Sequence, residues 1–299
     1  MSSLIEVKSL TKNFGAKKAL NNVSFQIEKG APVALVGPNG AGKTTLFSIM
    51  CGYLKASSGT VSILGNKPGH PSTFGKLAAL PQDALLDPRF SIAHQLTFYA
   101  KLQGINNKKA KLEVERTLDL VGLSDVINEK PTALSHGMRK RVAIAQSLIG
   151  KPEIVMLDEA TAGLDPKHAR DVRELVASLS DETTFILSSH DLSELERLCQ
   201  HVLYIENGVL QEHQTINVND NLQYLTLRME RQYPGFEAAL SELLEIKQVE
   251  NTQDKEYLIT AENDETTQSI DIAVLQLCHQ NSWRYRQMIN GKTLENQLF

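Results

Sequence analysis

One eight-residue stretch, Gly37-Pro38-Asn39-Gly40-Ala41-Gly42-Lys43-Thr44, constrains this chain more than any other part of its sequence. It fits the pattern G-x-x-x-x-G-K-[ST], follows an apolar run at 32–36 and precedes a helical stretch at 44–50. Glycines let the backbone curl until its N–H groups point at phosphate oxygens, and a helix beginning at Lys43 directs its positive dipole end there. The pattern therefore predicts a phosphate-binding loop in which Lys43 reaches the terminal phosphates and the Thr44 hydroxyl is a ligand of Mg²⁺; a glycine-rich turn that only caps a helix is the alternative.

The order of the apolar runs predicts the architecture around this loop. Short runs at 32–36, 154–157 and 184–187 read as buried strands, and each precedes a helix-like segment, which is typical of a parallel α/β sheet. Residues 4–8 and 23–27 alternate instead, as antiparallel strands beside that sheet would. From about 84 to 146 the strand patterns disappear. Apolar residues recur every three or four positions at 92–102 and 110–121, so we expect a helical insertion with helices there.

The chain is long enough for two domains, and charge marks where the second begins. Its 299 residues carry a net charge of −4, which divides into +2 for residues 1–216 and −6 for residues 217–299. A polar run at 216–221 separates the two parts. The second part reads as strand, helix, two strands, helix, strand, with strands at 224–229, 246–250, 257–261 and 283–289 and helices at 236–244 and 268–279. This order predicts a small acidic α+β domain with the split βαβ, ferredoxin-like motif.

Composition excludes several classes of protein. An acidic chain is an unusual binder of duplex nucleic acid, so no direct contact with nucleic acid is expected. The cysteines Cys51, Cys199 and Cys278 are far apart and odd in number, which argues against a disulfide framework or a zinc site. The first residues lack the pattern of a signal peptide, and no run of 18 apolar residues occurs, so we expect any membrane role to act through a partner.

Acidic and imidazole side chains follow two of the predicted strands. Asp158 and Glu159 end the apolar run at 154–157, and His190 follows the run at 184–187. Ligands of open α/β sheets bind at the carboxyl ends of the strands. We therefore expect Asp158 to hold Mg²⁺ beside Thr44, Glu159 to orient or deprotonate an attacking water, and His190 to contact the terminal phosphate. A helix-capping acid and a structural histidine are the alternatives.

With these residues in place, the chain resembles the nucleotide-binding subunits of ATP-binding cassette (ABC) transporters. The stretch Leu134-Ser135-His136-Gly137-Met138-Arg139-Lys140-Arg141 is similar to the family signature L-S-G-G-Q-x-x-R. The phosphate loop, Gln82, this signature, Asp158-Glu159, Gly163-Leu164-Asp165 and His190 occur in the family's order and spacing, and the resemblance covers about residues 3–215. It implies a P-loop NTPase fold with a RecA-like core, an antiparallel β subdomain and a helical subdomain at about 84–146.

The resemblance also assigns roles to individual residues. It implies ATP binding by Phe14, Gly37, Pro38, Asn39, Gly40, Ala41, Gly42, Lys43, Thr44 and Thr45, with Phe14 stacked on adenine unless it is a core residue. It implies that Glu159, His190 and Gln82 are catalytic and that Thr44, Gln82 and Asp158 hold Mg²⁺. It implies that Ser135, His136, Gly137 and Met138 bind the ATP held by a second subunit, and that Gly163, Leu164 and Asp165 contact that subunit.

Three departures from the family pattern matter for function. His136 replaces the first glycine of the signature, Ala160 stands where proline often follows the acidic pair, and Phe14 stands where tyrosine is commoner. None of these departures removes a group that does chemistry, so we expect function to be retained. The ending Leu294-Glu295-Asn296-Gln297-Leu298-Phe299 is similar to the tail of a small accessory domain in some exporter-type subunits. A regulatory module and a plain solvated domain both fit residues 217–299.

The leading hypothesis is an ATPase that energises a membrane exporter. It would work as a dimer with itself or with a similar cassette, bound to an integral membrane permease on the cytoplasmic face of the membrane. Two alternatives remain. One is a soluble ABC ATPase acting on ribosomes or nucleic acid, although the chain has one phosphate loop and an acidic tail. The other is a regulatory protein that only binds nucleotide, against which Lys43, Asp158, Glu159 and His190 argue.

Overall fold

The computed structural model describes residues 3–190, 195, 198–199, 201–211, 214–215, 222–243, 246–253, 255–262 and 270–291. The chain forms two compact units, Met1–Thr215 and Ile216–Phe299. The polar run at 216–221 and the tail at 292–299 lie outside the described residues, so the domain limits 1–216 and 217–299 stay a prediction.

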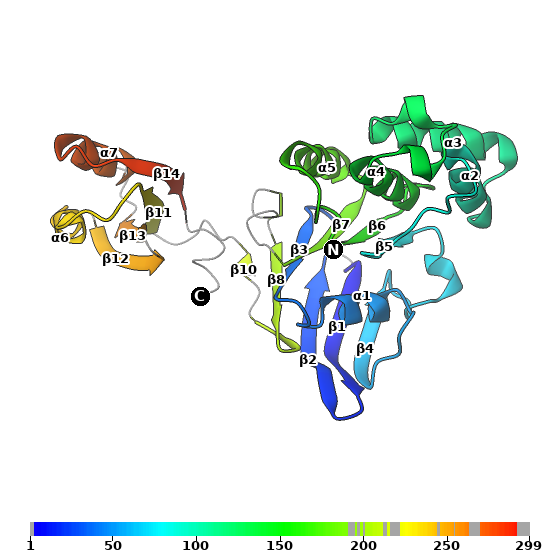
Figure 1. Cartoon of the computed structure of the whole chain (residues 1–299). Helices are drawn as coiled ribbons and strands as arrows, with labels where there is room; N and C mark the ends of the chain where they lie inside the picture. Colours follow the sequence, from blue (N-terminus) through cyan, green and yellow to red (C-terminus); the bar gives the residue numbers. More distant parts are fainter. Residues whose placement is uncertain are drawn as a thin grey trace. The chain divides into compact units, whose positions relative to one another are not determined.

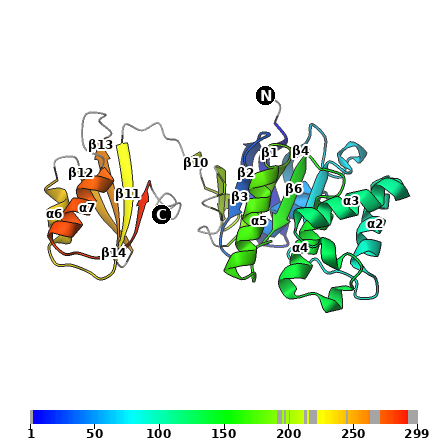
Figure 2. The same cartoon turned by 90° about the horizontal axis from the view of Figure 1, so that it is seen from above.

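Among its described residues, unit 1 contains two sheets and five helices. Figures 1 and 2 show their arrangement. Its strands are β1 (Ile5–Phe14), β2 (Lys17–Ile27), β3 (Val33–Val36), β4 (Ser58–Ile63), β5 (Leu77–Leu80), β6 (Ile154–Asp158), β7 (Thr184–Ser189), β8 (His201–Glu206), β9 (Val209–Leu210) and β10 (Gln214–Thr215). Its helices are α1 (Lys43–Met50), α2 (Ile92–Leu102), α3 (Asn107–Leu120), α4 (His136–Ser147) and α5 (Pro166–Leu179), with 3₁₀ turns at Pro71–Thr73, Ser124–Val126 and Pro131–Ala133.

The larger sheet has the strand order β10-β8-β3-β7-β6-β5, with β9 paired to β8. The pairs β3–β7, β3–β8, β6–β7 and β5–β6 are parallel, as the alternation of apolar runs and helices predicts. Strands β3, β6 and β7 are buried along their whole length, since helices cover a parallel sheet on its faces. Their carboxyl ends therefore meet at one edge, where β3, β6 and β7 lead into the predicted site residues.

The smaller sheet is antiparallel, with the order β2-β1-β4. Helix α1 lies between the two sheets, and its buried Leu46, Phe47, Ile49 and Met50 share one hydrophobic core with both of them. Figure 1 shows the helices α2 and α3 grouped at one end of unit 1 beside α4. The described residues from 84 to 146 contain no strand, so the predicted helical insertion is present.

The helices of the insertion differ slightly from the prediction. Helix α2 has the expected bounds, Ile92–Leu102, and the Ser91 side chain caps it by accepting from the His94 N–H. Helix α3 begins at Asn107, earlier than the apolar pattern suggested, because the Asn106 side chain accepts a hydrogen bond from the Lys109 N–H. An N-terminal cap, rather than the apolar face, thus sets where this helix starts.

Unit 2 contains β11 (Leu222–Met229), α6 (Phe236–Ser241), β12 (Ile246–Gln253), β13 (Glu256–Glu262), α7 (Ile270–Gln280) and β14 (Tyr285–Asn290). The antiparallel sheet has the order β12-β13-β11-β14, which is the split βαβ arrangement predicted from the element order. Residues of both helices share one core with inward-facing residues of β11 and β13, so α6 and α7 cover the same face of the sheet (Figure 2).

Several element ends in unit 2 differ from the sequence prediction by one to three residues. Helix α6 ends at Ser241, and the predicted end at Leu244 lies outside the described residues. Strand β14 begins at Tyr285 rather than Trp283. The Trp283 ring packs edge-on against Phe236 of α6, with centroids 5.2 Å apart, so this aromatic residue serves the core before the strand begins.

Candidate active site

The loop between β3 and α1 has the conformation that its glycines predict. Gly37, Gly40 and Gly42 have φ angles of 157°, 82° and 116°, a region that favours glycine. A side chain at Gly37 would place its Cβ 2.0 Å from the Ile205 carbonyl oxygen, and one at Gly42 would come within 2.7 Å of the Ala19 carbonyl oxygen. The loop is thus held between β8 and β2, and it leads directly into α1 at Lys43.

Lys43 lies under this loop with only 5% of its surface exposed. Its Nζ donates to the carbonyl oxygens of Gly37 at 2.6 Å and Pro38 at 3.3 Å. Burial lowers the pKa of Lys43, while the nearby charges of Glu159 and Asp158 act in the opposite direction. The ammonium group is therefore held at the loop, facing the two predicted acids.

Thr44 and Asp158 come together as the sequence predicted. The Thr44 hydroxyl donates to Asp158 Oδ2 at 3.1 Å, although the two residues are far apart in the chain. Asp158 is 3% exposed at the end of β6, and its Oδ1 accepts a hydrogen bond from the Ser188 hydroxyl of β7. These contacts fix the Asp158 carboxylate beside α1. The Thr44 hydroxyl and an Asp158 carboxylate oxygen therefore lie next to each other.

Glu159 contacts the side chains of Gln82, Ser188 and His190. It is 8% exposed and follows β6 with a φ of 49°, in the left-handed region that non-glycine residues rarely adopt. Its Oε2 accepts from Gln82 Nε2 at 3.0 Å, and its Oε1 lies 3.4 Å from His190 Nδ1. Its backbone N–H donates to the Ser188 hydroxyl oxygen at 2.9 Å. The structure thus groups Gln82, Glu159 and His190, the three residues expected to be catalytic.

Phe14 ends strand β1, and its ring is 49% exposed. The alternative of a core phenylalanine is therefore wrong. The Lys12 Nζ lies 4.9 Å from the ring centroid, a cation–π contact. Phe14 pairs with Lys17 at the turn into β2, the strand whose Ala19 lies against Gly42 of the phosphate loop. An exposed ring on this hairpin is open to stacking, and its role toward adenine stays a prediction.

The signature residues begin α4, beside the 163–165 loop. The Ser135 hydroxyl caps the helix by accepting from the Met138 N–H at 3.2 Å. A Cβ at Gly137 would lie 3.6 Å from Leu164 Cδ2, and one at Gly163 would lie 3.8 Å from His136 Nε2. The two sequence-predicted contact segments are therefore neighbours, with His136 exposed at the helix start.

Two residues of this site were missed by sequence reasoning. Ser188 bonds both Asp158 and the Glu159 backbone, and its place in a buried strand two residues before His190 was the only available signal. Lys140 of α4 donates through Nζ to the Glu159 carbonyl oxygen at 2.9 Å and also to the Ala162 carbonyl oxygen. Nothing in the pattern of the signature indicates that this lysine reaches another loop.

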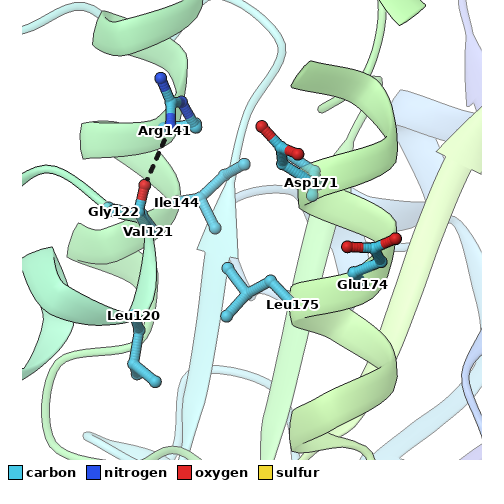
Figure 3. Close-up of a pocket in the computed structure, with 9 residues that line it drawn as sticks. Leu120, Val121, Gly122, Arg141, Ile144, Asp171, Glu174 and Leu175 are labelled. Atoms are coloured by element: carbon cyan, nitrogen blue, oxygen red, sulfur yellow. Dashed lines mark hydrogen bonds between the residues drawn. The ribbon is translucent and has the colours of Figure 1, made fainter. Parts of the chain in front are cut away.

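The last signature residue, Arg141, points to the other side of α4. Arg141 lines a cavity of about 210 Å³ between α4, α5 and the end of α3. Figure 3 shows its side chain opposite those of Asp171 and Glu174. Its Nη1 donates to the Val121 carbonyl oxygen at 3.1 Å, and its buried Nε has no hydrogen-bond partner in the described part of the chain. Arg141 therefore ties α4 to α3.

Comparison with known proteins identifies the family. A model of the ABC transporter family matches residues 20–162. An uncharacterized ABC transporter ATP-binding protein, YcbN of Bacillus subtilis, is 32% identical over 235 residues, which cover 76% of this chain and 75% of the relative. The chain belongs to the ABC transporter ATP-binding proteins. The linearmycin resistance ATP-binding protein LnrL of the same organism is 32% identical over 208 residues, covering 69% of this chain and 67% of LnrL.

Solved ABC cassettes share the fold of unit 1. A dimeric ATP-binding cassette in a post-hydrolysis state, bound to ADP and Pi, superimposes with a TM-score of 0.65 and 25% identity, covering 71% of this chain and 99% of that chain. An ATP-binding subunit of an ABC transporter has a TM-score of 0.65 and 26% identity, with 72% and 90% covered. The predicted P-loop NTPase fold is thus confirmed, and this ABC protein is an ATPase by family.

Asp165 caps the N-terminus of α5, and a substitution tests what this cap contributes to stability. Asp165 Oδ1 accepts from the N–H groups of Lys167 and His168, both at 3.1 Å, and Oδ2 contacts His168 Nδ1. The His168 hydrogen bonds lower the pKa of Asp165. We expect Asp165→Ala to lower the midpoint of thermal unfolding at pH 7 by about 2–4 °C, because α5 loses its N-cap.

The pH dependence of this effect has a defined sign. A depressed pKa in the folded state stabilises the protein above the unfolded pKa, and this contribution is lost as the pH falls through the folded value. The difference between wild type and Asp165→Ala should therefore shrink in acid. Asp181→Ala removes the same charge beyond the end of α5 and is the control. Equal shifts for the two variants would contradict a capping role.

Proposed function

We propose that this chain is the ATP-hydrolysing subunit of a membrane exporter, and that ATP drives closure of a dimer of such cassettes. The observation that carries the proposal is the grouping at Glu159. Gln82 Nε2 lies 3.0 Å and His190 Nδ1 lies 3.4 Å from its carboxylate oxygens, at the sheet edge where Thr44 bonds Asp158. A phosphate loop, a buried base and its orienting partners at one edge are the parts that phosphoryl transfer to water needs.

The oxygen donors at this edge fit Mg²⁺. The Thr44 hydroxyl and the Asp158 carboxylate are already hydrogen-bonded to each other, and hard oxygen ligands are those that Mg²⁺ prefers. Thr44, Gln82 and Asp158 would hold the ion, which when bound neutralises charge on the phosphates. No cluster of three or more His, Cys, Asp or Glu side chains suited to a metal occurs among the described residues.

The residues of the chain divide the reaction between them. Backbone N–H groups of residues 37–44 and the Lys43 ammonium bind the phosphates, and the exposed Phe14 ring stacks on adenine. Glu159, oriented by Gln82, takes a proton from a water that attacks the γ-phosphorus, and the bond to the β-phosphate oxygen breaks to leave ADP and phosphate. His190 contacts the γ-phosphate beside Glu159.

The signature and the 163–165 loop serve a second subunit. Ser135, His136, Gly137 and Met138 would bind the γ-phosphate of ATP held by that subunit, because the N–H groups and the dipole at the start of α4 favour an anion. Gly163, Leu164 and Asp165 lie next to this segment and would contact the same subunit. The partner is a second copy of this chain or a similar cassette.

The helical insertion offers the surface for a membrane permease. A groove of about 530 Å³ runs between α2 and α3, and it is lined by Phe98, Lys101, Lys111 and Ile127 among others. The Phe98 side chain is 54% exposed and Leu102 is 56% exposed, so apolar surface is available beside lysines. None of the described helices has the length and the apolar character that a membrane span requires. We place the protein on the cytoplasmic face of the membrane through this groove.

Export as the direction of transport is supported by the names of relatives. LnrL is a linearmycin resistance protein, and a Nod factor export ATP-binding protein of Ralstonia nicotianae is 32% identical over 208 residues, covering 69% of this chain and 65% of the relative. An ATPase acting on ribosomes or nucleic acid is disfavoured by the net charge of −4. A protein that only binds nucleotide is disfavoured by the complete Glu159 grouping.

Copurification tests this function. A tagged chain extracted in mild detergent should carry an integral membrane protein and no RNA. Phe98→Glu should reduce recovery of that protein at least about tenfold, because a charge replaces an apolar anchor, and should leave the ATPase activity of the isolated chain unchanged. Val209→Glu, a similar change at a 38% exposed residue of β9, is the control. Recovery of ribosomal RNA in place of a membrane protein would favour the alternative.

A further inference from the structure

A lysine of the signature helix contacts the turn that carries Glu159. Lys140 lies in α4, and its Nζ donates to the carbonyl oxygens of Glu159, at 2.9 Å, and of Ala162. These two carbonyls are the first and last of a four-residue turn, which the Ala162 N–H closes on the Glu159 carbonyl oxygen at 3.2 Å. One ammonium group thus bridges both ends of the turn.

The 159–162 turn needs hydrogen bonds from neighbouring elements, because Glu159 has an unfavourable backbone conformation. Glu159 has a φ of 49°, and an ordinary L residue stays in that region only when its surroundings hold it there. Its N–H is held by Ser188, and its carboxylate is held by Gln82 and His190. Its carbonyl is held by Lys140. Lys140 therefore holds the Glu159 carbonyl from helix α4.

Ala160, the residue after Glu159, makes the turn depend more strongly on the hydrogen bonds from Lys140. Ala160 stands where the family pattern often has proline, whose ring restricts φ and stiffens a turn at this position. Without that restriction, the turn relies on external hydrogen bonds to stay in one conformation. The Lys140 ammonium has two carbonyl acceptors, and hydrogen bonds from a charged donor are stronger than neutral ones.

We propose that Lys140 is a positioning residue for ATP hydrolysis: it fixes the 159–162 turn, and through it the Glu159 carboxylate, in place of the missing proline. The proposal rests on the proposed role of Glu159 as the base. Because Lys140 belongs to the same helix as Ser135 and Gly137, it also connects the signature to the base of its own subunit. The Lys140 ammonium holds the turn that carries the base, so we expect it to act on the rate of hydrolysis.

The test compares Lys140→Met with the wild-type chain together with its membrane subunit. We expect kcat to fall about 10- to 100-fold, since a displacement of about 1 Å at a reacting group costs that much, while KM for ATP stays within about twofold. Lys140→Arg keeps a charged donor and should retain most of the rate. Lys29→Met removes an exposed lysine from the loop between β2 and β3 and should change nothing.

Rescue distinguishes positioning from a general structural role. Adding Ala160→Pro to Lys140→Met should restore most of kcat, because the proline ring stiffens the same turn covalently. Should Lys140→Met fail to fold, as judged by its thermal unfolding, Lys140→Gln takes its place with the same rescue required. An unchanged kcat in the lysine variant, or a double variant that stays slow, would overturn the proposal.

Measuring wild type and Glu159→Gln alongside the lysine variants separates failure of the proposed ATPase function from failure of the proposed role of Lys140. If wild type hydrolyses ATP and Glu159→Gln does not, the proposed function stands, and the lysine variants alone decide the role of Lys140. If wild type shows no Mg²⁺-dependent hydrolysis even with its membrane subunit, the proposed function fails and the role of Lys140 fails with it.

Discussion

Glu159→Gln abolishes ATP turnover and leaves ATP binding intact: this is the largest effect we expect from a single substitution. The amide keeps the size of the side chain and an oxygen for the Gln82 Nε2 hydrogen bond, which is 3.0 Å long in the wild type. It cannot accept a proton from the attacking water. Since general base catalysis contributes about 10²–10⁴-fold, kcat should fall at least about 100-fold.

The same variant should accumulate as an ATP-bound dimer. If ATP closes two cassettes and hydrolysis permits opening, a chain that binds but does not hydrolyse stays closed. Light scattering after gel filtration, with ATP and Mg²⁺ present, measures this directly. Glu153→Gln is the matched control, because Glu153 precedes β6 and pairs with Lys76 at 3.1 Å on the surface. Undiminished hydrolysis by Glu159→Gln would contradict its role as the base.

Lys43→Ala should act one step earlier, on ATP binding itself. Lys43 is buried under the loop and contacts the Gly37 carbonyl oxygen at 2.6 Å, so its ammonium is held where phosphate oxygens would lie. Hydrogen bonds to charged groups contribute about 1.5–3 kcal/mol each, so losing one weakens ATP binding roughly 10- to 150-fold. Titration with a fluorescent ATP analogue, followed by competition with ATP, measures the affinity.

The Lys43→Ala variant needs a control for its stability, because charged residues surround Lys43. Lys43 lies near the charges of Asp158 and Glu159, so its loss also removes a cation beside two buried acids. Thermal unfolding of Lys43→Ala without nucleotide therefore accompanies the titration. Lys43→Arg keeps the charge but brings a larger, planar group into a loop closed by the Gly37 carbonyl, and it should also bind ATP weakly. Wild-type affinity in a folded Lys43→Ala variant would show that this lysine does not bind the phosphates.

Sequence reasoning succeeded where the signal is local or the chemistry demands a residue type. The phosphate loop, the apolar strands 154–157 and 184–187 and the helix at 92–102 each carry their own periodicity or glycine pattern, and each is present near its predicted bounds. It also grouped Thr44, Asp158, Glu159 and His190, because strands of a parallel sheet end at one edge. The arrangement of unit 2 followed from the order of its elements.

It did less well where a residue serves a distant partner. The start of α3 depended on a capping side chain, and the start of β14 on the Trp283 ring packing against Phe236. Phe14 could be a core or a surface residue until its 49% exposure was known. Ser188 and Lys140 carry no motif of their own, and their hydrogen bonds cross from one element to another.

The sequence by itself determined the family, the phosphate-binding loop and the residues available for chemistry, because these depend on residue types at short spacings. Only the tertiary structure decided how Glu159 is held: its N–H by β7, its carbonyl by α4 and its carboxylate by Gln82 and His190. The physical reason is that hydrogen bonds of a few ångströms join residues that lie tens of positions apart. Their geometry is set by how the helices and strands pack, which no local pattern encodes.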